Sequence, residues 1–295
     1  MSGGFSGRGR TRLAPYLFVL PNMLIFGIFI IYPALNAFNI SRYDSRNGRT
    51  FTPVGTRNYE RLFGDEEFWA AAWHTVVFVV CYVALSVVLA IGIALLLNQR
   101  IRFRGVFRAT VFLPKLLSPV VVGLIFGWIF ERRVGLLNSV LGAVGLPQPA
   151  WLTDGTLSMV CTVGVAIWLH VGFYTLIILS GLQGIEPTYY EAAQIDGAGA
   201  WARFRNITLP LVAPTTMVVV ILSMIEGFQA FDFIYTLTGG GPVGATTLMV
   251  QYIYEHGFQS PIRYGLAAAG SVTLFCTIFA LTVLNFWYGR RRESL

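Results

Sequence analysis

Charged side chains are scarce in this sequence. Asp, Glu, Lys and Arg make up only 12% of the 295 residues, which is about half the share in a typical soluble domain. Hydrophobic residues make up 55%, and so few charges could not cover a core of that size with a polar surface. The composition therefore excludes a soluble globular protein and predicts a chain that crosses a membrane several times.

Cysteine is rare as well, and no familiar catalytic pattern is present. Cys81, Cys161 and Cys276 lie inside apolar runs without metal-ligand spacing, so we expect buried thiols and no metal site. The sequence contains no G-x-x-x-x-G-K-[ST] phosphate loop, which ATP-hydrolysing subunits use to hold nucleotide. Its spans hold no Ser/His/Asp group and no matched carboxylates. We therefore expect this chain neither to be an enzyme nor to bind a cofactor.

Six apolar stretches are long enough, at about 20 residues, to cross a bilayer as helices. They are residues 13–38, 70–97, 109–130, 157–182, 211–236 and 265–288. The first is too long for a signal peptide and lacks a cleavage site, so we interpret it as a span. The prediction is an all-α polytopic membrane protein with one transmembrane domain, 13–288, between an N-terminal basic tail, 1–12, and a C-terminal tail, 289–295.

Arginine is divided unevenly between the two sets of loops that six spans would create. One set carries 12 Arg against 4 acidic residues, whereas the other carries 8 Arg against 8. Because loops rich in Arg and Lys remain in the cytoplasm, we expect the first set, and with it both termini, to be cytoplasmic. That set consists of residues 1–12, 98–108, 183–210 and 289–295. The basic pI near 9.5 then reflects orientation and not nucleic-acid binding.

A polar segment separates the fourth and fifth spans. Glu186-Pro187 is typical of a helix start, because proline fits the first helical position, and Gly197 follows a run of good helix formers. We expect two short helices joined by a turn at Gly197, with Pro210 at the start of the fifth span. Helices this short are marginal in water, so the segment should dock on a partner protein or lie on the lipid surface.

The same segment carries a known signature. Glu191-Ala192-Ala193, Gly197, Ile207 and Leu209-Pro210 fit the pattern E-A-A-x3-G-x9-I-x-L-P. Together with further motifs, the signature makes the sequence similar to membrane subunits of binding-protein-dependent ABC importers, specifically the carbohydrate-uptake branch of maltose- and glycerol-phosphate-type first permeases. The further motifs are NYERLF at 58–63, IALLLNQ at 93–99, FRGVFRATVFLPKLLSPVVVG at 103–123, GLLNSVLG at 135–142 and FDFIYTLTGGGP at 231–242. The resemblance extends over about residues 13–288 and implies a MetI-like transmembrane fold.

In that family the signature segment is a coupling helix, which sits in a cleft of a cytoplasmic ATPase and transmits its closure to the spans. The resemblance implies this role for Glu191, Ala192, Ala193, Asp196, Gly197, Ala198, Trp201, Phe204, Ile207, Leu209 and Pro210. It also implies a bacterial inner membrane location and three kinds of partner: a second homologous permease, two ATP-binding subunits that hold ATP and Mg, and an extracytoplasmic solute-binding protein. The solute-binding protein is expected to contact the segment formed by Gly239, Gly240, Gly241 and Pro242. The alternative is that this segment is a simple turn.

Charges inside a span are costly unless they are paired or face water. Glu226, Gln229 and Phe233 fall near one face of a continuous helix, and a carboxylate, an amide and an aromatic ring can bind a sugar. We expect them, with Tyr174, to contact substrate, or Glu226 to pair with a polar residue of the second permease. Counting along the helices separates Lys115 from Glu226 by about 12 Å along the membrane normal, so we expect no direct pair between them without helix tilt.

Three features remain outside this set. His170 shares a helix face with Tyr174 and is expected to be a packing residue, and Asp232 is expected to hold the external end of the fifth span. Lys115 departs from the family, whose members often have an aromatic or apolar residue there. The leading hypothesis is the permease subunit of an ATP-driven carbohydrate importer. The alternatives are a permease for a non-sugar solute and an autonomous secondary transporter that uses Glu226 or Lys115 as an ion site.

Overall fold

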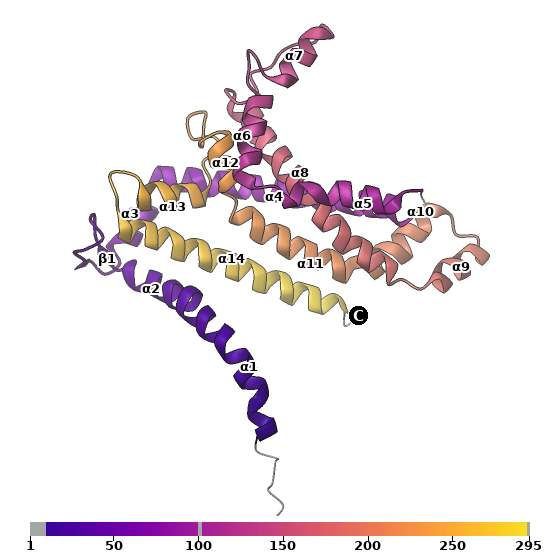
Figure 1. Ribbon diagram of the computed structural model, residues 1–295, viewed down its shortest axis with the longest axis horizontal. Coiled ribbons are helices and arrows are strands. Elements are labelled where there is room, and N and C mark those ends of the chain that lie inside the picture. Colours follow the sequence, from indigo (N-terminus) through magenta and orange to yellow (C-terminus); the bar gives the residue numbers. More distant parts are fainter. Residues whose placement is uncertain (1–9, 100–101, 294–295) are drawn as a thin grey trace, which may run out of the picture. The chain divides into compact units, whose positions relative to one another are not determined.

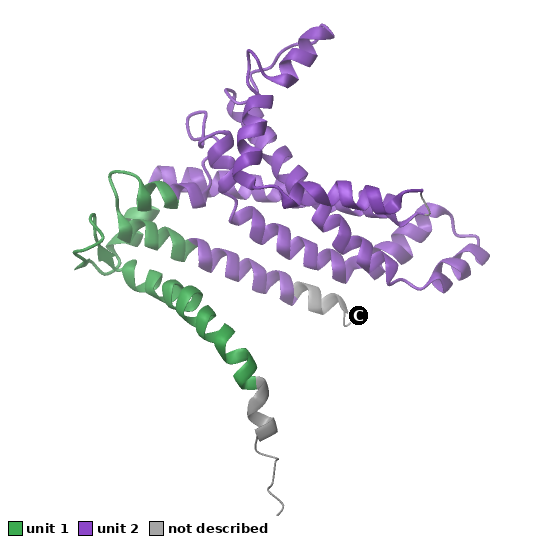
Figure 2. Ribbon diagram, viewed as in Figure 1, with its two compact units in different colours: residues 1–64, 253–273 green, residues 65–252, 274–295 purple. Residues whose placement is uncertain are grey.

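The structure is a computed structural model that describes residues 10–99 and 102–293, including the side chains of residues 16–99 and 102–287. The predicted basic tails, 1–12 and 289–295, therefore lie outside the residues whose side chains are described. The chain divides into two units, residues 1–64 with 253–273 and residues 65–252 with 274–295 (Figure 2). The described residues are mainly helical and contain one two-stranded sheet, which confirms the predicted all-α class.

Five helices in the described part of the chain are long and apolar enough to cross a membrane. They are Tyr16–Ile40, Glu66–Asn98, Gly155–Gln183, Ala200–Phe228 and Tyr264–Trp287. They correspond to the predicted first, second, fourth, fifth and sixth spans, although the bounds of the fifth differ. The stretch predicted as the third span is a pair of helices, Arg104–Leu116 and Pro119–Ile129, that meet at 96°.

The first unit contains the first membrane helix, a two-stranded sheet, a short helix and parts of two C-terminal helices. Its elements are α1 (Arg10–Phe26), η1 (Gly27–Ile31), α2 (Tyr32–Ile40), β1 (Tyr43–Asp44), β2 (Thr52–Pro53), α3 (Arg57–Phe63) and parts of α13 (Met249–Phe258) and α14 (Tyr264–Glu293). The two strands pair antiparallel with Tyr43 opposite Pro53. The amide of Asn58 donates to the carbonyl oxygens of Ser41 at 2.8 Å and Tyr43 at 2.9 Å, which fixes α3 to the chain that leaves α2.

The second unit contains the remaining membrane helices. Its elements are α4 (Glu66–Asn98), α5 (Arg104–Phe112), η2 (Leu113–Leu116), α6 (Pro119–Ile129), α7 (Leu136–Ala143), α8 (Gly155–Gln183), α9 (Pro187–Ile195), α10 (Ala200–Arg203), η3 (Phe204–Thr208), α11 (Leu209–Phe228), α12 (Asp232–Leu237) and the other parts of α13 and α14. Helices α4, α8 and α11 pack along one another (Figure 1). Asp65 and Asp154 cap α4 and α8 by accepting backbone N–H groups of the first turn, as N-cap carboxylates do.

The break in the third span follows from its prolines. Pro119 is the first residue of α6, and proline pushes the residue before it out of the helical region. Ser118 accordingly has φ −64° and ψ 125°, and Leu117 is also extended, with φ −78° and ψ 148°. Two consecutive extended residues separate the two helices, which meet at 96°, so the stretch predicted as the third span, 109–130, is a bent pair and not one continuous helix.

The fifth span also differs from the prediction of 211–236. One 29-residue helix runs from Ala200 to Phe228, and a separate helix, α12, begins at Asp232 after Phe231 adopts φ −151° and ψ −57°. Apolar residues continue across this break, so hydropathy alone extends the span too far. Near the start of this helix, the π-turn η3 replaces the usual hydrogen bond to the fourth preceding residue by one to the fifth, from the N–H of Leu209 to the carbonyl oxygen of Phe204. This wider turn accommodates Pro210 without ending the helix.

Candidate coupling loop and intramembrane polar cluster

The segment between α8 and α11 forms the expected helix and turn. Pro187 is the first residue of α9, preceded by the extended Glu186. At the other end, the N–H of Ala198 bonds to the carbonyl oxygen of Ala193 at 2.8 Å, and Gly197 adopts φ +77°. This is the Schellman closure of a helix, in which glycine takes the left-handed position that a side chain disfavours. The predicted turn at Gly197 is therefore confirmed, whereas the predicted second short helix is the start of the long α10–α11 helix.

The surface of this segment is apolar and open. Ile195 is 87% exposed, Trp201 71% and Tyr189 54%, and α9 lies beyond the ends of α8 and α11 (Figure 1). Among the signature residues, the exposed ones are Glu191, Ala192, Asp196, Gly197, Trp201, Leu209 and Pro210, and the partly buried ones are Ala193, Ala198, Phe204 and Ile207. Exposed apolar groups beside small residues are typical of a surface that packs against another molecule.

The segment is also tied to the membrane helices. The hydroxyl groups of Tyr190 and Thr208 form a hydrogen bond of 3.0 Å, and Thr208 is buried. The rings of Trp201 and Phe204 lie 5.4 Å apart. The α9 segment is therefore joined to the first turns of the helix that carries Glu226, both through the chain and through this side-chain contact.

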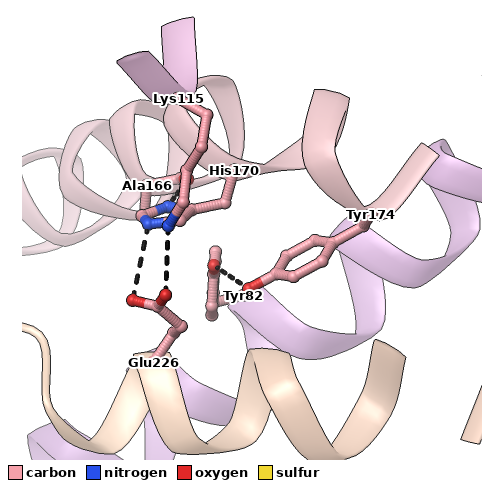
Figure 3. A network of polar contacts seen from close by, with 6 residues as sticks. All are labelled: Tyr82, Lys115, Ala166, His170, Tyr174 and Glu226. Atoms are coloured by element: carbon pink, nitrogen blue, oxygen red, sulfur yellow. Dashed lines mark hydrogen bonds and ion pairs between the residues drawn. The ribbon is translucent and has the colours of Figure 1, made fainter. Parts of the chain in front are cut away.

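Glu226 lies at the centre of a polar cluster within the membrane helices (Figure 3). Its Oε1 atom accepts a hydrogen bond from Nζ of Lys115 at 3.0 Å, and its Oε2 atom lies 3.6 Å from Nε2 of His170. Glu226 belongs to α11, Lys115 to η2 and His170 to α8. The Lys115–Glu226 pair therefore joins the broken third span to the packed helices α4, α8 and α11. The expectation that Lys115 and Glu226 are not in contact is wrong, because it assumed a straight third helix.

His170 does more than fill space. Its Nδ1 atom lies 2.9 Å from the carbonyl oxygen of Ala166, and a carbonyl can only accept, so the proton of a neutral ring belongs on Nδ1. Nε2 then carries no proton, and its contact with Glu226 Oε2 is attractive only when the ring holds a second proton. His170 is thus a hydrogen-bonded packing residue of the bundle, as expected, and it also lies beside the Glu226 carboxylate.

Two buried tyrosines pack against the His170 ring. Tyr82 and Tyr174 are 1% and 0% exposed, and their hydroxyl groups are 2.9 Å apart. The Tyr82 ring meets the His170 ring edge to face with 6.0 Å between centroids, and the Tyr174 ring stacks on His170 at 6.3 Å. Buried hydroxyls need partners, and these two satisfy each other, while their rings hold the imidazole between them; Tyr174 itself is buried. Tyr82 was not singled out from the sequence.

A close approach of two helices positions the lysine. Gly172 lies on α8 between His170 and Tyr174, and a Cβ atom there would collide with the carbonyl oxygen of Val111 on α5. Glycine thus lets α5 pack directly against α8, and this contact brings η2, and with it Lys115, to the cluster. The Nζ atom of Lys115 also lies 5.8 Å from the centre of the Phe173 ring, within the range of a cation–π contact.

The accessibility of the other predicted substrate residues varies. The side chain of Glu226 is 47% exposed and that of Lys115 29% exposed, and Gln229, the C-cap residue that follows α11, is exposed. Phe233 is only 4% exposed and belongs to α12, so the argument that put it on one helical face with Glu226 is wrong. Substrate contact by Glu226, Gln229, Phe233 and Tyr174 remains a prediction.

The loop after α12 is a tightly bonded turn. Gly239 and Gly240 adopt φ +60° and +86°, Gly240 is buried, and Gly241 and Pro242 are partly exposed. The Thr246 hydroxyl donates to the Gly241 carbonyl oxygen at 2.8 Å. The tip of the turn is Val243, which is fully exposed. A contact between this loop and another protein would thus be made by its tip more than by the glycines.

Comparison with known proteins gives concordant results. Residues 86–294 match the family described as the inner membrane component of binding-protein-dependent transport systems. The chain is 37% identical over 286 residues to a trehalose/maltose transport system permease protein of Thermococcus litoralis, covering 95% of this chain and 94% of that one. It is 34% identical to a lactose transport system permease protein of Rhizobium radiobacter, covering 94% of each.

Two further similarities extend the comparison. An sn-glycerol-3-phosphate transport system permease protein of Agrobacterium fabrum is 32% identical, with 96% of each chain covered. Among solved structures, a chain of a bacterial alginate ABC transporter, crystallised with an alginate pentasaccharide-bound periplasmic protein, superposes with a TM-score of 0.84 at 24% identity, covering 96% of each chain. The last similarity establishes the fold alone.

Proposed function

This chain belongs to the family of inner membrane components of binding-protein-dependent transport systems, and from this premise we propose that it is a permease subunit of an ATP-driven importer for a carbohydrate. The observation that carries the proposal is the exposed α9 segment, which has the complete E-A-A-x3-G-x9-I-x-L-P signature. This segment connects the helices α8 and α10–α11, which carry His170 and Glu226 of the polar cluster. In this proposal the chain is a transport subunit and not an enzyme. It binds no cofactor itself, and ATP and Mg are held by partner subunits.

The carbohydrate class is supported by the relatives and by the chemistry of the cluster. The compared permeases are named for trehalose/maltose, lactose and sn-glycerol-3-phosphate transport. Glu226 and Gln229 present acceptors and donors for hydroxyl groups at an accessible position. In its pair with Lys115, the carboxylate adds no net charge, so the cluster suits a polyhydroxylated solute without strong charge.

The coupling role is proposed for the α9 segment. A cytoplasmic ATPase would cover Ile195, Trp201 and Tyr189, whose exposed fractions leave an apolar surface without a cover in the isolated chain. A second permease would complete the transport path, and an extracytoplasmic binding protein would contact the loop around Val243. Both termini and α9 would face the cytoplasm, as the arginine distribution predicts.

The test is transport by the purified assembly. The tagged chain is purified with its associated subunits, identified by mass spectrometry, and reconstituted into liposomes with ATP inside and the binding protein outside. We expect uptake of labelled trehalose, maltose or lactose that requires ATP, and we expect a Walker-type ATPase and a second permease among the subunits. Uptake by the chain alone without ATP would replace the proposal with a secondary carrier, and ATP-driven uptake restricted to amino acids would refute the carbohydrate class.

A further inference from the structure

Two arginines line a pocket at the end of the membrane helices where α9 lies. The pocket has a volume of about 730 Å³ and is walled by the ends of α4 and α8, the first turns of α5, and α9. Its polar lining includes Arg104, Arg108, Gln183, Tyr190 and Glu191. The size is that of a site for a small organic molecule. All of the pocket lies within one unit of the chain.

Among the described residues, the two guanidinium groups converge on one uncharged acceptor. Arg104 and Arg108 are four residues apart and therefore share a face of α5. With its oxygen turned toward them, the Gln183 amide accepts from Nη2 of both. No carboxylate of the described residues lies within ion-pair distance of either arginine, and the Nε atom of each is buried without a hydrogen-bond partner.

This arrangement is unfavourable unless something else enters the pocket. One amide oxygen orients both cations but cannot neutralise them, and two positive charges that share an acceptor repel each other. Each buried Nε–H also lacks a partner, which costs free energy. A phosphate group would neutralise the two cations, because its oxygens accept charge-assisted hydrogen bonds from guanidinium groups. With Glu191 on the facing wall, the lining has a net charge of +1, which suits a singly charged phosphate.

We propose that this pocket binds the phosphate group of an anionic molecule, through Arg104 and Arg108, with Gln183 holding the two arginines in place. The group could belong to a lipid headgroup or to a free phosphate, and basic pockets between helices on the cytoplasmic side of a membrane commonly take anionic headgroups. Because its walls include α5, the end of α8 and α9, an occupant would hold the α9 segment against the helix that leads to Lys115. The site would thus adjust how readily α9 moves, independently of which solute is transported.

The test measures the thermal stability of the full chain, with its co-purifying subunits and without nucleotide, by tryptophan fluorescence. One arm adds inorganic phosphate to nanodiscs of phosphatidylcholine, with sulfate as the comparison anion. The other arm uses nanodiscs in which 30% phosphatidylglycerol replaces phosphatidylcholine. Since a ligand stabilises the folded state that binds it, we expect a melting temperature at least about 2 °C higher in one arm or both. A rise only with phosphatidylglycerol identifies a headgroup, and a rise with free phosphate identifies a soluble ligand.

The variants assign the effect to the pocket. Arg104→Gln/Arg108→Gln should abolish the rise, and the single variant Arg108→Gln should reduce it if the double variant does not fold. Arg102→Gln is the matched control, because Arg102 is exposed on the same segment and lies against the Phe103 ring, outside the pocket. The proposal is overturned if neither arm stabilises the wild-type chain or if the double variant responds equally. A response that appears only after the ATPase partner has been removed also overturns it, since a carboxylate of that partner would then occupy the pocket in the assembly.

Discussion

The contact between Lys115 and Glu226 gives the sharpest test of the intramembrane cluster. The perturbation is a double-mutant cycle that consists of Lys115→Gln, Glu226→Gln and the combination of both. Each single variant leaves one charge in the membrane helices without its 3.0 Å partner, whereas the double variant leaves none. Glu226→Gln keeps the shape of the side chain and Lys115→Gln keeps much of its length, so the coupling reports chiefly the charge interaction.

The expected magnitude follows from distance and exposure. Two unit charges 3.0 Å apart attract by about 5 kcal/mol at an effective dielectric constant of about 20. The side chains are 29% and 47% exposed, so screening reduces this value, and we expect a coupling free energy of about 1–3 kcal/mol. His170 preserves part of the contact in the single variant that lacks Lys115, which is a further reason for the lower half of that range.

The assay is the melting temperature of the assembled protein in nanodiscs, measured for all four forms. We expect both single variants to be less stable than the wild type, and the double variant to be no less stable than the worse single variant. The matched control is the exposed pair Arg61–Asp44, at 3.7 Å with 50% and 30% exposure, whose cycle should give a coupling close to zero. Strictly additive losses at Lys115 and Glu226 would refute the assignment of a stabilising intramembrane pair.

Further predictions address the loop, the helix contact and one surface turn. Gly172→Ala should destabilise the chain by about 1–3 kcal/mol through overpacking, because its Cβ would meet the Val111 carbonyl oxygen, whereas Gly164→Ala on the same helix has open space and should be neutral or stabilising in the same melting assay. Glu191→Lys and Gly197→Asp should abolish ATP-driven uptake while membrane insertion, followed by fractionation, is retained, and normal uptake in either would contradict the coupling proposal. Backbone N–H groups, chiefly that of Val134, lower the pKa of Glu131. Glu131→Gln should therefore reduce the melting temperature at neutral pH, and this difference should disappear as the pH falls through the lowered pKa.

Hydropathy and short motifs predict most of this fold because most of its helices are determined by the residues within them and not by contacts with other helices. The apolar helices are long, and the bilayer requires each to satisfy its own backbone hydrogen bonds. The α9 turn is equally local, since Pro187 and Gly197 fix the two ends of the helix through their own backbone preferences. These features do not depend on the other helices, so they can be predicted from the residues concerned.

The breaks in the third and fifth spans depend on more than composition. Pro119 and Pro114 are visible in the sequence, but prolines also occur inside intact membrane helices, as Pro214 does inside α11. What distinguishes the third span is the pair of extended residues at 117–118. The end of α11 at Phe228 has no helix-breaking residue directly after it, and α12 packs against α6. The contact between α12 and α6 favours a separate helix at Asp232–Leu237, and a hydropathy profile contains no information about such a tertiary contact.

The polar cluster was missed in part because only the charged residues, Lys115 and Glu226, were compared in depth, and His170 was left out of that comparison. Counting at about 1.5 Å per residue places His170 about 20 Å from Gln183 and Glu226 about 22 Å from Leu211, so the two lie at similar depths on helices joined by the α9 segment. The neutral histidine was therefore a predictable neighbour of Glu226, whereas Lys115 became one only because its helix breaks.

The chain order of these elements connects the two candidate sites mechanically. Helix α8 leads into α9 and carries His170, and the α10–α11 helix leads out of it and carries Glu226. The contact of 3.6 Å between these residues thus lies between the two helices that a displacement of α9 would move. A shift of either helix by one or two ångströms would break that contact and leave Glu226 held by Lys115 alone, which belongs to a third segment. On this geometry the cluster joins the helix that leads into α9, the helix that leads out of it and the broken third span, so it is the polar contact that a movement of α9 would alter first.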